Sequence, residues 1–305
     1  MSGASGEASL SKLTSLMIAI FSGLALTCDL AFGAGVDSPP DFAPNPSVGW
    51  VSSGVRLLPP PGGGPGPVVA DPGRRGGSNN GVQYMFPIGD LSAPILQPWA
   101  RERMRQRNER VLAGKPGFSQ QASCWPAGTP AFLTYAVQPV YFVQSAKEVL
   151  MIWQADHQIR RVYMNVPHSP NPRPSWFGES VGHYEGDALV IDTIASDTRT
   201  FIDQFDTPHT ERLHTVERYH MTNGGKTLEV NLHVEDPGAF TMPWDAIQRY
   251  KRVEPGVADV TDPFNPLSAT SRAGPMLEAS CAENPNSLLG AEGAFPIPQT
   301  REPDF

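Results

Sequence analysis

The feature that most constrains this fold is a hairpin pattern between residues 214 and 234. Within residues 227–234, leucine and valine occupy every even position from 228 onward, and polar residues occupy most of the odd ones. Such alternation is typical of a β-strand with one buried face. The turn Asn223-Gly224-Gly225 separates this run from residues 214–221 and is the strongest hairpin signal in the chain. The pattern predicts two antiparallel strands.

Shorter strand patterns fill most of the remaining region from residue 130 to residue 252. They cover residues 140–144, 149–154, 156–163, 180–184, 188–193 and 240–252. About eight strands with hairpin connections, and no helical pattern between them, favour a meander that closes on itself. The fold class that we expect is all-β, an antiparallel lipocalin-like (calycin-type) barrel.

The flanking segments differ from this region in composition. Residues 98–113 place Ala100, Met104 and Val111 on one stripe with arginines opposite, which predicts a short amphipathic helix. The 32 prolines and 29 glycines crowd toward the two ends of the chain. We therefore expect a helix-plus-barrel domain over residues 86–252, a Pro/Gly-rich disordered linker over 34–85 and an extended tail over 253–305.

The first 33 residues have the character of an export signal. A lysine precedes an apolar run at residues 16–27, which is shorter than the ~20 residues that a membrane-spanning helix needs. We predict a signal peptide over residues 1–33 and a periplasmic or secreted protein without a membrane span after its removal. A lipoprotein anchored through Cys28 is the alternative. The formal net charge of −8 disfavours nucleic acid as a partner.

Removal of the signal peptide leaves two cysteines, Cys124 and Cys281. Thiols tend to pair in an oxidising compartment, so we predict a disulfide between them. The alternative is two unrelated buried thiols.

Glu217 is the first candidate for a functional site. It shares the odd-numbered face of its predicted strand with Leu213, Thr215 and Tyr219. If the apolar ends of this face point inward, Glu217 does too, and a buried carboxylate needs a partner or a raised pKa.

A family resemblance rests on residues 176–193, which have the sequence WFGESVGHYEGDALVIDT. This segment resembles a motif of a large family of exported bacterial proteins, often written WMGxSVGxWEGDTLVVDT. The similar positions continue at Arg199-Thr200, Asp203, Pro208-His209, Leu213, Glu217-Arg218, Asp236-Pro237 and the segments around Cys124 and Cys281. The resemblance covers roughly residues 120 to 285 and implies the fold and export, but no activity. The chain departs from the pattern at residues 196–198, Ser-Asp-Thr, where the family more often has Phe-Asn-Asp.

Several polar residues in these segments could meet at the interior or mouth of a barrel. We take Glu217, His209 and Arg160 as candidate catalytic residues, with Glu217 or His209 as general base and Arg160 as the group that binds a carboxylate or oxyanion. The candidate ligand-binding residues are His157, Asp192, Asp203 and Tyr219. The alternative is a set of structural ion pairs, Arg160 with Asp192 or Arg218 with Glu217, that fix strand register.

Motifs for metals and cofactors are missing from the sequence. It contains no HExxH segment, close Cys/His cluster, Walker loop or GxGxxG turn after a strand, so we expect neither a metal nor a cofactor. The function that we expect is a barrel that binds a small apolar or aromatic molecule and can transform it by proton transfer, elimination or hydrolysis. The alternative is a non-catalytic, envelope-associated structural or interaction module. The sequence makes no prediction of oligomeric state.

Overall fold

The computed structural model describes residues 38–45, 47–74, 87–114, 120, 124–134, 139–154 and 158–253. The predicted signal peptide, the predicted tail from residue 254, His157 and Cys281 lie outside these ranges. The signal peptide and the Cys124–Cys281 disulfide therefore stay predictions.

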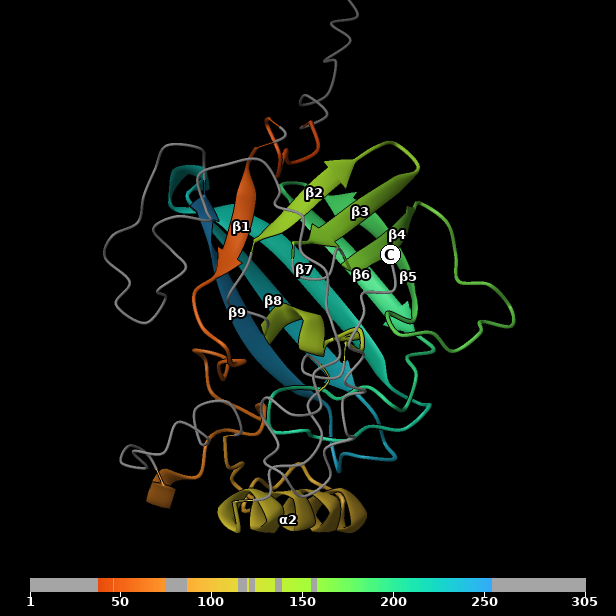
Figure 1. The fold of residues 1–305 in the computed structure, drawn as a ribbon. Helices are drawn as coiled ribbons and strands as arrows, with labels where there is room; N and C mark the ends of the chain where they lie inside the picture. The colour runs from red at the N-terminus through yellow and green to blue at the C-terminus, as the bar shows by residue number, and fades with distance from the viewer. Residues whose placement is uncertain are drawn as a thin grey trace, which may run out of the picture. The chain divides into compact units, whose positions relative to one another are not determined.

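Nine strands in the described residues form one closed barrel and follow one another in chain order around it (Figure 1). The strands are β1 (Gly49–Ser52), β2 (Val140–Gln144), β3 (Glu148–Trp153), β4 (Gln158–Met164), β5 (Glu179–Glu185), β6 (Ala188–Ile194), β7 (His214–Thr222), β8 (Thr227–Glu235) and β9 (Trp244–Val253). The prediction of an all-β barrel is confirmed. The predicted hairpin is β7 and β8, joined by the 3-10 turn η5 (Asn223–Gly225), in which Gly224 has a positive φ of 62°.

The prediction that all strand pairs are antiparallel is wrong at one step. Every neighbouring pair is antiparallel except β4 and β5, where Val162 pairs with Ser180 in parallel. A parallel pair needs a crossover of about a dozen residues or more, and residues 165–178 supply it. We call residues 165–178 the crossover loop. In the sequence, a Pro-rich crossover looks the same as an ordinary connection between antiparallel strands, so the parallel pair was not predicted.

The prediction of a disordered linker over residues 34–85 is wrong where β1 forms. Figure 1 shows β1, orange, beside β9, blue, and the four residues of β1 pair with residues 250–253 of β9. Phe42, Val48 and Trp50 are buried, and the Trp50 indole N–H donates a hydrogen bond to the Phe42 carbonyl at 2.8 Å. This short strand closes the seam between β2 and β9, which would otherwise expose unpaired backbone groups. The folded domain therefore begins well before residue 86.

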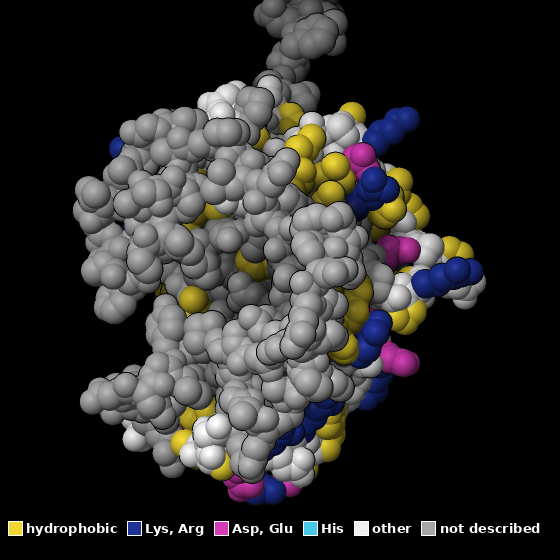
Figure 2. Space-filling model, in the orientation of Figure 1, with side chains coloured by type: hydrophobic (Ala, Val, Ile, Leu, Met, Phe, Trp, Pro, Cys, Tyr) yellow, Lys and Arg dark blue, Asp and Glu magenta, His cyan; other side chains and the backbone are white. Residues whose placement is uncertain are grey.

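The predicted amphipathic helix is confirmed as α2 (Pro98–Leu112), which buries Ala100, Met104, Asn108 and Val111. Its arginines lie among acidic residues, and Arg105 pairs with Glu102 and Glu109 on the exposed side. On the described part of the face in Figure 2, basic, acidic and apolar side chains are interspersed. In the part of the chain that the structure describes, no helix is both long and apolar enough to cross a bilayer.

A short segment packs against the inner face of the barrel. The 3-10 turn η3 (Ala131–Thr134) is buried, and the Leu133 carbonyl accepts hydrogen bonds from Tyr250 Oη at 2.9 Å and from Gln248 Nε2 at 3.0 Å. We call residues 127–134 the plug. Because Tyr250 and Gln248 belong to the buried face of β9, the plug occupies space in the barrel interior.

Candidate functional site

An ion pair lies in the barrel interior between Arg160 of β4 and Glu217 of β7. Arg160 Nη1 is 2.6 Å from Glu217 Oε2, and neither side chain has any exposed surface. Strand alternation explains the burial, because both residues belong to the inward-facing set of their strands. The structure therefore brings together two of the three predicted catalytic residues.

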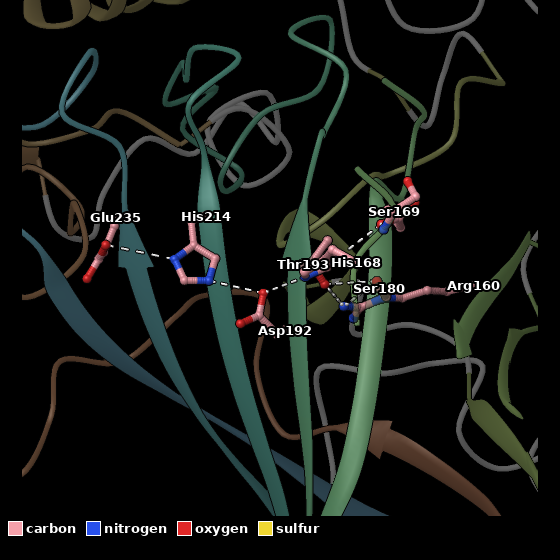
Figure 3. Close-up of polar contacts among 9 residues, drawn as sticks. Arg160, His168, Ser169, Ser180, Asp192, Thr193, His214 and Glu235 are labelled. Atoms are coloured by element: carbon pink, nitrogen blue, oxygen red, sulfur yellow. Dashed lines mark hydrogen bonds and ion pairs between the residues drawn. The ribbon is translucent and has the colours of Figure 1, made fainter. Parts of the chain in front are cut away.

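The remaining Arg160 donors point to two hydroxyl groups on neighbouring strands. Nη2 donates to Thr193 Oγ1 at 2.9 Å, and Nε and Nη2 both lie 3.3 Å from Ser180 Oγ (Figure 3). Burial by itself lowers the pKa of Arg160, but Glu217 and Tyr219 together outweigh burial and keep the pKa above its ordinary value. Arg160 of β4 is thus a permanent cation that bonds side chains of three further strands, β5, β6 and β7.

Tyr219 completes this interior cluster. Its hydroxyl donates to Glu217 Oε2 at 2.7 Å, and burial raises the pKa of Tyr219 well above its ordinary value, so the phenol remains a donor. The prediction that Thr215, Glu217 and Tyr219 share an inward face is confirmed. Glu217 Oε1 and Thr215 Oγ1 are buried and have no hydrogen-bond partner among the described residues.

A small apolar gap adjoins the cluster at Tyr219. It lies between Trp50, Phe142, Met151, Tyr250 and neighbouring side chains, and it has no space for a water molecule. The gap gives the polar cluster an aromatic wall, but in this conformation it is closed.

Asp192 does not belong to the interior cluster, and the predicted Arg160–Asp192 pair is wrong. Asp192 is next to Thr193 on β6, so the two side chains point to opposite faces, and Asp192 is 39% exposed on the outer wall. The predicted Arg218–Glu217 pair is wrong for the same reason, since Arg218 faces outward and pairs with Glu185.

Asp203 and His209 fix the loop between β6 and β7. Asp203 accepts hydrogen bonds from the Phe205 amide at 2.9 Å and from the Thr207 hydroxyl at 2.9 Å, and burial raises its pKa to about 6. His209 is bonded to Thr200 Oγ1 at 2.8 Å and to the Thr210 carbonyl at 3.0 Å, and burial lowers its pKa.

No described contact joins Asp203 or His209 to Arg160 or Glu217. The predicted constellation of Glu217, His209 and Arg160 is therefore not assembled in this structure.

A polar network on the outer wall was not predicted from the sequence. Histidines and carboxylates alternate across β5 to β9 in the order Glu179, His168, Asp192, His214, Glu235, His233 and Asp245. The successive nitrogen–oxygen distances are 3.0, 2.9, 3.1, 3.8, 3.1 and 2.7 Å. We call these seven side chains the ribbon, and Figure 3 labels four of them, His168, Asp192, His214 and Glu235. Alternation in the sequence could identify the outward-facing strand positions of this network, but only the strand register brings their side chains close to one another.

Neither possible metal ligands nor comparisons with known proteins assign a function to this site. Among the described residues, no group of three or more His, Cys, Asp or Glu side chains has an arrangement that could hold a metal ion. Comparisons with protein-family models, with curated proteins and with solved structures find no match.

Proposed function

We propose that this protein is an exported, lipocalin-like barrel that binds a small apolar or aromatic molecule through Glu217. The observation that carries the proposal is Glu217 Oε1, a fully buried carboxylate oxygen without a partner in the described part of the chain. The ligand would carry an N–H or O–H group that donates to this oxygen.

The energetics of the interior cluster support a ligand contact. Removing a charged pair from water costs several kcal/mol per ion, roughly, and is offset only when the hydrogen-bonding capacity of both ions is used. Arg160 uses its donors on Glu217, Ser180 and Thr193, whereas Glu217 uses one oxygen for both of its bonds. A donor from a ligand would use the second oxygen.

The aromatic gap beside Tyr219 is where the apolar part of the ligand would bind. Ligand sites in barrels combine apolar walls with a few convergent polar groups. Because the gap is closed, ligand entry requires a side chain to move, and Met151 is suited to this because methionine side chains adapt easily.

Binding is better supported than turnover. Glu217 Oε2 accepts from both Arg160 and Tyr219, and His209 is bonded to Thr200 and Thr210 instead of to this cluster. The proposal therefore contains no reaction. Export and membership in the resembling family of exported bacterial proteins are part of the proposal and rest on the first 33 residues and on residues 176–193.

A second candidate function is a non-catalytic, envelope-associated structural or interaction module. One observation favours it: the inward side chains around Tyr219 leave no space for water in the gap between them. In that case the polar cluster serves only to fix the register of β4 to β7.

Benzene-sized probes that differ only in their donor group test the proposal. Phenol and aniline can donate to Glu217 Oε1, whereas toluene cannot. We expect phenol and aniline to raise the melting temperature of the purified protein and toluene to have little effect. Tyr219→Phe leaves the Glu217 carboxylate in place and should keep this preference, and Glu217→Gln should lose it. Equal responses to all three probes would mean that binding does not use the contact with Glu217, and no response to any probe would instead support the structural module.

A further inference from the structure

The crossover loop is attached to the outer wall by few contacts. Most of its side chains from residue 165 to residue 175 are exposed, so apolar packing contributes little. Ser169 donates its backbone N–H to Glu179 Oε1 at 2.7 Å, and His168 reaches Glu179 and Asp192 (Figure 3). His168 is thus the side chain that joins the loop to both β5 and β6.

The hydrogen-bond geometry of His168 selects one protonation state. Its Nδ1 is 3.0 Å from Glu179 Oε1, and its Nε2 is 2.9 Å from Asp192 Oδ1. An ionised carboxylate only accepts hydrogen bonds, and a neutral imidazole has a single N–H. Both contacts are therefore hydrogen bonds only when His168 is an imidazolium. A neutral ring would direct a lone pair at one of the carboxylates.

The same geometry recurs at the other end of the ribbon. His233 Nδ1 is 2.7 Å from Asp245 Oδ1, and its Nε2 is 3.1 Å from Glu235 Oε1. Between the two ends, His214 Nε2 is 3.1 Å from Asp192 Oδ1, the oxygen that also faces His168. Three histidines thus alternate with four carboxylates, and within the described chain no lysine or arginine pairs with any of them.

We propose that the ribbon is a proton-dependent latch that holds the crossover loop against the barrel wall when its histidines are protonated. The charged groups that face these histidines are Glu179 from β5, Asp192 from β6, Glu235 from β8 and Asp245 from β9. Loss of the His168 proton removes one of the two bonds that this side chain makes to β5 and β6, while Ser169 keeps its own bonds to Glu179.

The pKa shifts along the ribbon agree with this geometry. The hydrogen bond to Asp192 raises the pKa of His214 above its ordinary 6.5. Burial lowers the pKa of His233, but its bonds to Asp245 and Glu235 outweigh burial and raise it. Burial by itself raises the pKa of Asp192, but the hydrogen bonds from His214 and His168 outweigh burial, so the pKa of Asp192 is lowered.

The latch is therefore closed over a limited range of pH. The raised pKa values of His214 and His233 stabilise the folded ribbon below about pH 6.5, and this stabilisation is lost as the pH rises through the folded-state values. The lowered pKa of Asp192 adds stability above about pH 3.8, which is the ordinary pKa of an aspartate, and this stability is lost in stronger acid. The closed window is thus mildly acidic.

The loop also contacts the plug. The Phe177 ring packs edge-on against Phe132 with ring centroids 5.7 Å apart, and the Phe177 carbonyl accepts a hydrogen bond from the Thr129 hydroxyl at 3.3 Å. Movement of the loop would remove this support from the plug. Only the further step, that a loosened plug admits a ligand, rests on the proposed function.

Amide hydrogen exchange, followed by NMR on the ligand-free protein, tests the latch. The probes are the N–H groups of Ser169 and Ser175, which are bonded to Glu179 Oε1 and the Ala195 carbonyl. After correction for intrinsic rates, we expect their protection to fall about tenfold or more between about pH 5.5 and about pH 8.

Two variants separate the latch from general effects of pH. His168→Gln should show low protection at both pH values, with less than about a twofold change. His183→Gln is the matched control, because His183 is 50% exposed and forms its ion pair with a single carboxylate, Glu185, outside the ribbon; it should behave like the wild type. Unchanged protection in the wild type, or a full tenfold fall in His168→Gln, would overturn the latch. Neither result bears on Glu217 as a ligand contact, because no probe molecule is present.

Discussion

Two consecutive residues of β6, Thr193 and Asp192, belong to two polar networks that differ in their access to water. Thr193 faces the interior and bonds Arg160, which forms an ion pair with Glu217 without any exposed surface. Asp192 faces outward, is 39% exposed, and lies between His168 and His214. Both networks join several strands through charged hydrogen bonds.

The difference between the networks lies in what replaces a lost partner. Water can solvate any group of the outer ribbon, so its members can change protonation state at modest cost. Water does not reach the interior cluster, so each lost contact leaves a buried charge or donor. We therefore expect large effects on stability from interior substitutions and small, pH-dependent effects from the ribbon.

Trp50→Ala should give the largest loss, because this side chain is fully buried in the strand that closes the barrel. We expect the free energy of unfolding to fall by about 4 kcal/mol in chemical denaturation. Trp99→Ala is the control, because Trp99 is 41% exposed on α2, and it should cost less than about 1 kcal/mol. Equal losses would show that β1 is no more important than the surface.

Glu217→Gln should be nearly as severe. It leaves the Arg160 cation in the interior without a charged partner, which we expect to cost about 3 kcal/mol in the same denaturation assay. Arg218→Gln, at the next residue but on the outer wall, should cost under about 0.5 kcal/mol. A loss below about 1 kcal/mol for Glu217→Gln would break the contrast, because it would mean that Arg160 is solvated.

Asp203→Asn sharpens the contrast between acids with and without cationic partners. Burial raises the folded-state pKa of Asp203 from 3.8 to about 6, whereas the pKa of Asp192 is lowered by its histidines. A raised pKa means that the stability contributed by protonated Asp203 is present below about pH 4 and is lost as the pH rises through about 6.

The stability of the wild type relative to Asp203→Asn should therefore fall over this range, by on the order of 2 kcal/mol. Urea denaturation of both proteins from about pH 4 to about pH 7 measures the difference, and other titrations cancel between them. The asparagine oxygen can still accept from the Phe205 amide, so the loop is retained. A difference that does not change with pH would contradict the expected titration.

Asp245→Asn should give the smallest effect. Asp245 is 57% exposed at the end of the ribbon and bonds only His233 among the described side chains. We expect a loss of under about 0.5 kcal/mol that shrinks further in about 1 M salt, because exposed pairs are screened. A loss comparable to that of Glu217→Gln would mean that the ribbon acts as one tightly coupled network. The distinction between the interior cluster and the ribbon would then disappear.

Period-two patterns were sufficient to predict the barrel walls. Alternation placed Thr215, Glu217 and Tyr219 on one inward face, and the Asn223-Gly224-Gly225 turn located the β7–β8 hairpin, because both features are properties of neighbouring residues. The helix over residues 98–112 followed from its periodicity in the same way. Patterns failed at β1, where four residues are too few for a period and composition suggested a linker.

What the sequence by itself determined is therefore the class of fold, the hairpin and the face on which Glu217 lies. Only the tertiary structure decided that Arg160 is the partner of Glu217, that Asp192 belongs to the outer wall, and that β4 and β5 are parallel. The physical reason is that periodicity specifies which face of a strand a side chain occupies, whereas partners across a barrel depend on register and closure. Those are set by contacts between segments far apart in the chain, such as β1 with β9.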